Sequence, residues 1–386
     1  MPAFFSNIRT SLRAQFFKVL RRAVCAEDGR LALTEALRDQ LAWRRNELEA
    51  FSVEPPPYDL GSASKPQSVA QRDDIVLISG RFRSGSTLLW NLFRNIPGCV
   101  SYYEPFNERR WFDPTSRGEQ VDVSHRGVDD YWREYEHCEH LGKLYNDQWQ
   151  DRGFHLGAGD WNPQLKRFIE EVVQCSGSLR PVLQFNRIDF RLPWLRQTFP
   201  NATILHIYRH PRDQWCSVLQ KNERFPPDGH MADFAAADRF YTLRWARDLK
   251  YRFPFLDERS VEHPYQLHYF LWKLSYLYGR SYSDCSLSFE ELVTHPEATL
   301  FRVLDTCAID AAHVEPLCSL INPPPLGKWK TYADDAWFRR HETHCDDVLN
   351  EFFRNAPSAR QAAGTSAGTA AAVDACGPAG PSHMIY

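Results

Sequence analysis

A short apolar run leads directly into a turn that is rich in glycine and serine. Residues 75–78 (IVLI) are followed by residues 80–87 (GRFRSGST) and then by an apolar segment at 88–93. This order predicts a buried strand, a turn and a helix. In such a unit the backbone N–H groups of the turn converge on one point, where the helix dipole adds positive potential. The segment is therefore a candidate site for phosphate or a similar anion.

The spacing Gly80-x4-Gly85, followed by Thr87, matches the phosphate-binding P-loop pattern except at one position. Ser86 stands where that pattern has the lysine that reaches the β- and γ-phosphates, so hydrolysis of ATP or GTP is disfavoured. Arg83 supplies a cation from inside the turn instead. Its guanidinium can donate two hydrogen bonds to a tetrahedral oxyanion.

A second strand–turn–helix unit carries another candidate anion site. Residues 203–208 (TILHIY) predict a strand, Arg209 follows it directly, and Ser217 lies eight residues later in a predicted helix. Ligands of open parallel sheets collect at the carboxyl ends of the strands, so both units should face one crevice. Arg209 and Ser217 could hold a second phosphate there. The alternative is that Arg209 forms a surface ion pair with Asp213.

Four segments, in this order along the chain, resemble the motifs of sulfotransferases that use 3′-phosphoadenosine 5′-phosphosulfate (PAPS). The loop at 83–88 resembles the 5′-phosphosulfate loop of the carbohydrate and tyrosylprotein branches, and the pair Arg209…Ser217 resembles the 3′-phosphate motif. Residues 287–297 are similar to the later Tyr-Glu-Asp-Leu…Pro segment, and residues 327–330 to the segment that closes over the nucleotide. The resemblance covers residues 73–346.

The resemblance implies a P-loop-like three-layer α/β fold, with helices on both sides of a central parallel sheet. It also implies transfer of a sulfuryl group from the co-substrate PAPS to a hydroxyl or an amine of an acceptor, without a metal. The expected nucleotide-binding residues are Arg83, Ser84, Gly85, Ser86, Thr87, Leu88, Arg209, Ser217, Lys328 (on phosphate) and Trp329 (on the adenine face).

An acceptor hydroxyl must lose its proton as it attacks sulfur, and a carboxylate is a suitable general base. Glu104 is the candidate, because it lies 21 residues after Arg83, far enough for the chain to return to the same edge of the sheet. The surrounding Tyr-Glu-Pro also resembles the segment that carries the base in carbohydrate sulfotransferases. The alternatives are that Glu104 caps the next element or pairs with Arg109. Glu108 is a second candidate.

Cations near the leaving phosphate oxygen would stabilise its developing charge. Arg83 is the first candidate and Arg187 the second, because Arg187 follows a predicted strand at 182–185. The segment around Arg187 resembles the Asn-Lys-Asp-Pro-Phe of the tyrosylprotein branch, whose lysine is catalytic. Arg187 could instead belong to the acceptor site or serve the structure.

Two other functions stay open at this point. A P-loop-like kinase or NTPase would need the missing lysine and an aspartate for Mg²⁺. A non-catalytic nucleotide-binding protein on the same fold is possible if Arg83 or Glu104 lies outside the crevice.

The composition is that of an ordinary globular protein. The 386 residues include 46 Lys+Arg and 49 Asp+Glu, a net charge of −3, so neither a disordered chain nor a nucleic-acid binder with a basic excess is expected. The ten cysteines contain no CxxC pair, which favours reduced thiols and a cytoplasmic enzyme. No apolar run approaches the length of a membrane span.

The catalytic domain is expected at 71–355, between an N-terminal helical extension with a linker (1–70) and a disordered tail (356–386). Residues 1–25 predict a basic amphipathic helix that packs on the domain, contacts a membrane surface or targets the chain to an organelle. A helix is also predicted at 163–175, and the oligomeric state is left open.

Aromatic residues make up 14% of the chain, and many lie between the predicted base and the next helix. Aromatic faces among polar neighbours suit a glycan, a lipid-linked sugar or a small hydroxyl compound, although core packing would explain them equally well. We therefore expect part of the aromatic residues to form the core and the aromatic cluster at 107–161 to face the acceptor, most plainly a carbohydrate. The cluster contains Trp111, Tyr131, Trp132, Tyr135, Tyr145, Trp149 and Trp161.

Overall fold

The computed structural model describes residues 69–220 and 225–355, together with a few isolated positions before residue 30. The chain divides into two units, 1–66 and 67–386, and the second contains every element discussed below. The predicted basic helix at 1–25, the linker that follows it and the tail at 356–386 fall almost wholly outside the described residues.

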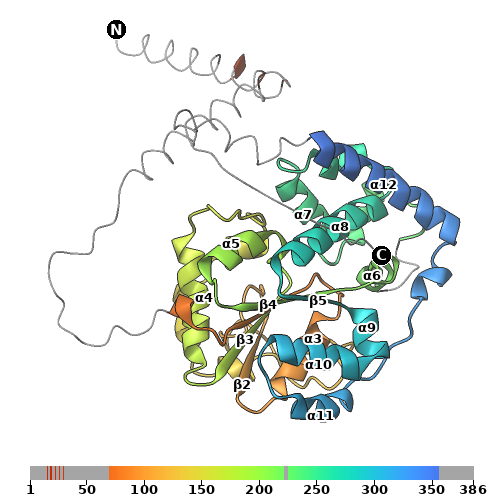
Figure 1. Ribbon diagram of the computed structural model, residues 1–386. Helices are drawn as coiled ribbons and strands as arrows, with labels where there is room; N and C mark the ends of the chain where they lie inside the picture. The colour runs from red at the N-terminus through yellow and green to blue at the C-terminus, as the bar shows by residue number, and fades with distance from the viewer. Residues whose placement is uncertain are drawn as a thin grey trace, which may run out of the picture. The chain divides into compact units, whose positions relative to one another are not determined.

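Five parallel strands form one sheet in the order β2-β3-β1-β4-β5 (Figure 1). They are β1 (Val76–Ser79), β2 (Cys99–Tyr103), β3 (Arg180–Phe185), β4 (Thr203–Tyr208) and β5 (Cys285–Ser288). The strands predicted from the sequence are confirmed. β1 and β4, which carry the two candidate anion sites, are parallel neighbours. Both sites therefore lie at the carboxyl ends of adjacent strands.

Helices cover both faces of the sheet, which confirms the predicted three-layer α/β fold. Val76 and Ile78 of β1 share a hydrophobic core with α3, α10 and α11, whereas Ile75 and Leu77 belong to the core of α4 and α5 (Figure 1). Alternate residues of a strand point to opposite faces, so Val76, Leu77 and Ile78 of β1 are all apolar. A third core joins α6, α7, α8 and α12.

The helix predicted at 163–175 is confirmed as α4. The bounds of all the helices discussed here follow. They are α3 (Ser86–Arg94), α4 (Pro163–Cys175), α5 (Leu192–Thr198), α6 (Pro211–Leu219), α7 (Thr242–Leu249), α8 (Pro264–Tyr282), α9 (Phe289–Thr294), α10 (Pro296–Thr306), α11 (Val314–Cys318) and α12 (Asp335–Asn355). None of the helices within the described part of the chain is long and apolar enough to cross a membrane.

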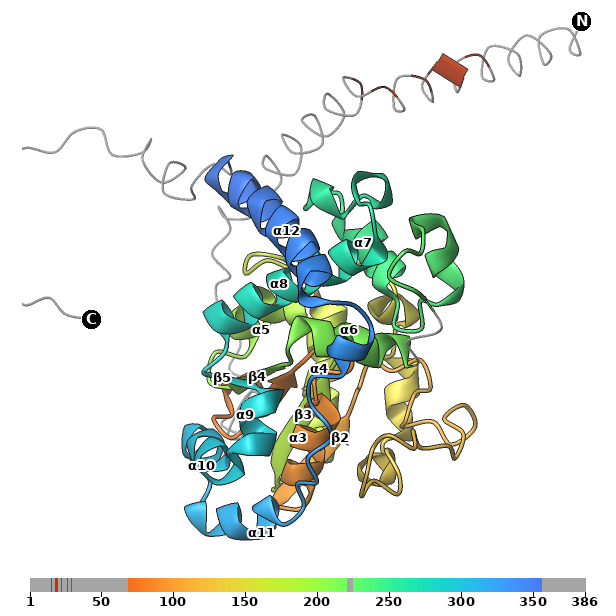
Figure 2. The ribbon, with the colours of Figure 1, turned by 90° about the vertical axis from the view of Figure 1, so that its right-hand side faces the viewer.

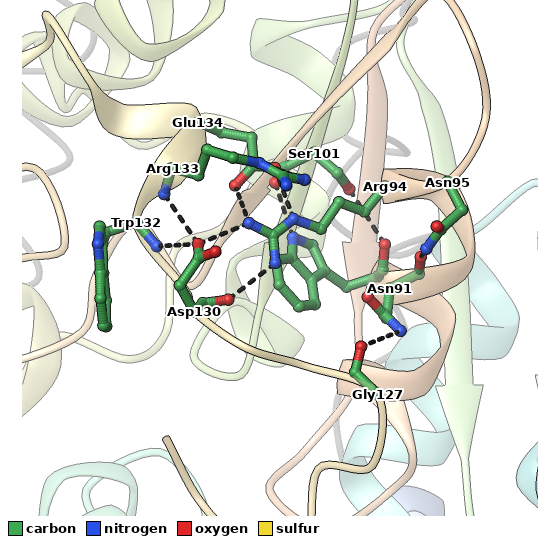
Figure 3. Close-up of polar contacts among 10 residues, drawn as sticks. Asn91, Arg94, Asn95, Ser101, Gly127, Asp130, Trp132, Arg133 and Glu134 are labelled. Carbon is green, nitrogen blue, oxygen red and sulfur yellow. Dashed lines mark hydrogen bonds and ion pairs between the residues drawn. The ribbon is translucent and has the colours of Figure 1, made fainter. Parts of the chain in front are cut away.

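The segment between β2 and α4 has no long helix or strand and extends to one side of the sheet as turns and short 3₁₀ helices (Figure 2). Arg94, at the end of α3, fixes it. Its guanidinium donates to the Glu134 carboxylate at 2.6 and 3.0 Å, and to the carboxylate and backbone carbonyl of Asp130 at 2.6 and 2.8 Å (Figure 3). Asn91, one turn earlier, donates to the carbonyl of Gly127 at 3.4 Å.

Candidate active site

The glycine–serine loop, residues 80–87, connects β1 to the N-terminus of α3. Gly85 precedes the helix with φ of 97°, and no side chain caps the first turn of α3. The Ser84 hydroxyl is buried and has no hydrogen-bond partner among the described residues. The free N–H groups at the N-terminus of α3 suit an anion.

Position 85 requires a glycine for two reasons, its left-handed backbone conformation and the nearby ring of Phe289. A Cβ atom there would lie 2.3 Å from the ring of Phe289, whereas a Cβ atom at Gly98, whose φ is 85°, would meet nothing within 4 Å. We expect Gly98→Ala to lower the free energy of unfolding by about 1 kcal/mol, from backbone strain alone. Gly85→Ala should lower it by about 3 kcal/mol or more, because steric overlap is added to strain. Urea unfolding of the two variants measures the difference; equal losses would contradict the steric role of Phe289.

Arg83 links the two predicted anion sites. Its Nε donates to the Ser217 hydroxyl on α6 at 3.0 Å, and another guanidinium nitrogen donates to the Ser124 hydroxyl at 2.9 Å. The Asp122 carboxylate lies 3.6 Å from the same nitrogen. Arg83 and Ser217, which are 134 residues apart in the chain, therefore share one site.

Arg209, directly after β4, is a buried cation without an anion. Its side chain is 7% exposed and lies over the ring of Phe289 at 4.8 Å. Within residues 69–220 and 225–355, no hydrogen bond or ion pair of its guanidinium is found, and its Nε is buried and unpaired. Burial lowers the pKa of Arg209 despite the nearby carboxylates of Asp213 and Glu290. Such an arrangement favours an anionic ligand.

Asp213 does not form the ion pair with Arg209 that the sequence left open. Its carboxylate instead accepts the backbone N–H groups of Gly327 at 2.8 Å and of Trp329 at 3.2 Å. This contact fixes the 3₁₀ helix Lys328–Thr331 against α6 and places Lys328 in the wall of the site. The Trp329 ring does not line the site, because it packs against Arg212 at 4.8 Å and Phe338 at 5.6 Å.

Glu104 follows β2 and lies in the wall of the same site, where Asn186 connects it to the start of α3. It is 5% exposed and has a positive φ of 39°, which L-residues rarely adopt. One carboxylate oxygen accepts a hydrogen bond from the Asn186 amide, and the other accepts one from Asn107 at 2.7 Å. Burial raises the pKa of Glu104 above the usual range of a glutamate, although the Arg187 guanidinium and the Asn107 amide oppose this shift.

Arg187 lies behind Glu104 rather than in the cavity wall. Its guanidinium is 2.7 Å from a carboxylate oxygen of Glu108 and 3.6 Å from Glu104, and it lies over the ring of Phe82 at 4.9 Å. The Glu108 carboxylate also accepts a hydrogen bond from the Tyr241 hydroxyl at 2.7 Å. Burial alone would raise the pKa of Glu108, but Arg187 and Tyr241 outweigh it, so this pKa is lowered.

Asn186 joins the glycine–serine loop to Glu104. Its carbonyl oxygen accepts hydrogen bonds from the Ser86 hydroxyl at 2.9 Å and from the Gln184 amide at 2.8 Å, which leaves its amide nitrogen to donate to Glu104. The sequence analysis did not single out Asn186. Its position directly after β3, next to β1 in the sheet, is a signal that could have identified it.

One cavity of about 670 Å³ contains most of the predicted site. The predicted residues in its wall are Arg83, Gly85, Ser86, Thr87, Leu88, Glu104, Arg209, Ser217 and Lys328. Ser84, Arg187 and Trp329 are not in the wall. Of the predicted aromatic set, only Trp111 and Tyr131 line the cavity; Tyr135 and Trp149 are core residues, and Trp161 is 86% exposed. The expectation that the set as a whole faces the acceptor is therefore corrected.

The described residues include no group of three His, Cys, Asp or Glu side chains that could hold a metal ion. His125, which also lines the cavity, carries no sequence signal that distinguishes it from other histidines.

The chain is similar to several proteins of known structure and to one protein family. A search of curated proteins gives no match. Among solved structures, a sulfotransferase of Mycobacterium avium covers 73% of this chain and 76% of its own, at 11% identity and a TM-score of 0.40. The sulfotransferase domain of the curacin biosynthetic pathway covers 72% of this chain and 98% of its own, at 16% identity and a TM-score of 0.40. A mouse sulfotransferase, solved in complex with the nucleotide PAP (3′-phosphoadenosine 5′-phosphate), covers 75% of this chain and 87% of its own, at 12% identity and a TM-score of 0.35.

The model of the sulfotransferase family matches residues 75–269, which is half of the chain. The match includes the glycine–serine loop, Glu104, Arg209 and Ser217. The chain belongs to the sulfotransferase family and is a transferase of the EC 2.8.2 type.

Proposed function

We propose that the enzyme transfers the sulfuryl group of PAPS to a hydroxyl, or an amine, of an acceptor by in-line displacement, with Glu104 as the general base. One observation carries the proposal: a single cavity is lined by an unpaired buried cation, Arg209, by the N-terminus of α3, and by a buried carboxylate whose pKa is raised. The first two features suit a nucleotide with two separate phosphate groups, and the third suits proton removal from an acceptor.

The residues of the cavity fit PAPS. Arg209, Ser217 and Lys328 would hold the 3′-phosphate, and the unpaired Arg209 Nε supports this assignment. The N–H groups of the first turn of α3, with Arg83, would hold the phosphosulfate end. When bound, PAPS supplies an activated sulfuryl group whose leaving group is a nucleotide phosphate. The cation nearest that phosphate would be Arg83 alone, because Arg187 is already paired with two glutamates.

Glu104 would accept the proton of the attacking hydroxyl. Its raised pKa makes it a stronger base than an exposed glutamate, and the amides of Asn107 and Asn186 hold its carboxylate in one orientation. We assign Arg187 a positioning role, because its contacts are to Glu104 and Glu108 rather than to the cavity. Glu108 is a weaker base than Glu104, because its pKa is lowered.

We propose a carbohydrate or glycoconjugate as the acceptor. Trp111, Tyr131 and Tyr241 contribute aromatic rings to the cavity wall that also contains Glu104, and Asn107 and Gln120 contribute polar groups to the same wall. Sugars pack their C–H faces on aromatic rings while their hydroxyls reach polar neighbours, and this wall offers both kinds of contact.

Calorimetric titration with the product nucleotide, 3′-phosphoadenosine 5′-phosphate (PAP), tests the function directly. We expect PAP to bind with a sub-millimolar Kd in the presence and in the absence of Mg²⁺, and ATP to bind at least tenfold more weakly, because ATP has no 3′-phosphate for Arg209. Absence of PAP binding would refute the proposal. Tight, Mg²⁺-dependent binding of ATP would favour the kinase or NTPase alternative.

A further inference from the structure

His125 lies in the cavity wall, on a loop whose residues 120–126 all line the cavity. The root of this loop is fixed by the contacts of Asn91 and Arg94 with residues 127–134 (Figure 3). Its middle is fixed at Arg83, which donates to Ser124 and lies 3.6 Å from Asp122. His125 is therefore held next to the loop arginine that we assign to the phosphosulfate end.

The imidazole also lies against the other residues of the proposed reaction centre. Its ring meets the ring of Tyr103 edge-on, with centroids 6.3 Å apart. The Tyr103 hydroxyl is 3.1 Å from the Thr87 hydroxyl in the first turn of α3, and Glu104 is the next residue in the chain. Arg83, the start of α3, Glu104 and His125 thus converge on one part of the cavity.

The hydrogen bonds of Tyr131 indicate which imidazole nitrogen carries the proton. The Tyr131 hydroxyl accepts the backbone N–H of Asp122 at 3.0 Å and lies 2.5 Å from His125 Nδ1. Burial raises the pKa of Tyr131 to about 12, so its hydroxyl keeps its proton and can donate it to Nδ1. In a neutral imidazole the remaining proton is then on Nε2, for which the described chain offers no hydrogen-bond partner.

We propose that His125 donates a hydrogen bond from Nε2 to an oxygen of the sulfuryl group of PAPS, and so distinguishes PAPS from PAP. This inference rests on the proposed function. The imidazole stays neutral near pH 7, because burial and Arg83 lower the pKa of His125 to about 4 although Asp122 opposes the shift. His125 is therefore a fixed donor and leaves the role of base to Glu104.

The test compares the affinities of PAPS and PAP, which needs neither an acceptor nor turnover. We expect His125→Leu to weaken PAPS binding by roughly tenfold and to leave PAP binding unchanged, because only PAPS carries the sulfuryl group. His125→Gln, whose amide N–H can replace the Nε2 donor, should recover most of the affinity for PAPS. Thermal unfolding of each variant with PAP present shows that the nucleotide site is intact.

Three outcomes would overturn the proposal: equal weakening of both nucleotides, no change with either, or a Gln variant as defective as the Leu variant. A Leu variant that does not fold requires a second measurement. In that case ¹⁵N NMR of the wild-type histidines decides, because an Nδ1–H tautomer at His125 excludes the proposed donor and an Nε2–H tautomer supports it. Tyr131→Phe should mix the two tautomers. If wild-type enzyme binds neither nucleotide, the proposed function itself fails, which is a distinct result.

Discussion

Replacing Glu104 with glutamine should lower turnover by a factor of about 10²–10⁴ while PAP binds as it does to the wild type. Glutamine has nearly the size of glutamate, but it cannot accept the proton of the attacking hydroxyl. The contacts proposed for the nucleotide are made by other residues, on α3, α6 and residue 328. Steady-state kinetics with PAPS, together with calorimetry with PAP, separate the two effects. An equal fall of affinity and turnover would contradict the role of a base.

Glu108→Gln is the matched control. Glu108 lines the same cavity, but Arg187 and Tyr241 already occupy its carboxylate, and its pKa is lowered where that of Glu104 is raised. We expect turnover to fall by less than about tenfold, through the loss of a contact that positions Arg187. If the Glu108 variant is as inactive as the Glu104 variant, the assignment of Glu104 rather than Glu108 as the general base is contradicted.

The pH dependence follows from the same carboxylate. Glu104 acts as a base only when it is deprotonated, so the rate should fall as the pH drops through its pKa. Because burial raises that pKa, the fall should begin at a higher pH than for an exposed glutamate. The Glu104→Gln variant should lack this acidic limb in its residual rate. If the limb persists there unchanged, another group is responsible for it.

Replacing Arg209 with methionine should weaken PAP binding by about 100-fold without destabilising the free enzyme. Methionine keeps the packing over Phe289 and removes the charge that would meet the 3′-phosphate. In the free enzyme that charge is buried without a partner, so its removal also removes a desolvation cost. We therefore expect unfolding of the free variant at an equal or higher temperature, with most of the stabilisation by added PAP lost.

Arg212→Met is the control for the Arg209 variant, because the two arginines lie three residues apart. Arg212 is paired with Glu342 and Asp335 at 2.7 Å and lies over Trp329. Its loss should cost about 1–3 kcal/mol of stability and leave PAP affinity near that of the wild type. If the Arg209 variant loses stability and keeps its affinity, Arg209 is structural and the 3′-phosphate lies elsewhere.

The sequence predicted those parts of the site that depend on the ends of strands. The runs before Gly80 and Arg209 are apolar because parallel strands are covered on both faces, so strand ends and the polar residues after them can be located from hydropathy alone. Glu104 is identified differently, by its separation of 21 residues from Arg83 and by the Tyr-Glu-Pro resemblance, and the structure places it directly after β2.

The choice of partner by each polar side chain was not predictable in this way. Asp213 lies four residues after Arg209, which suggested an ion pair, yet it accepts two N–H groups from a segment more than 110 residues away. Arg187 is the second candidate of the sequence for the leaving-group cation, with an acceptor-site or structural role left open, and its guanidinium contacts Glu104 and Glu108. These partners are set by tertiary packing, which brings together groups that have no relation in sequence.

The amide of Asn186 connects the glycine–serine loop to Glu104. Its oxygen is held by the Ser86 hydroxyl on the loop side, and its nitrogen donates to Glu104 on the acceptor side. Thermodynamic reciprocity requires that any effect of a loop ligand on the proton affinity of Glu104 be matched by an equal effect of Glu104 protonation on the affinity for that ligand. In the proposed reaction, a proton leaves from the Glu104 end of this chain of hydrogen bonds and the spent nucleotide leaves from the Ser86 end. Asn186 is the side chain that joins the two ends.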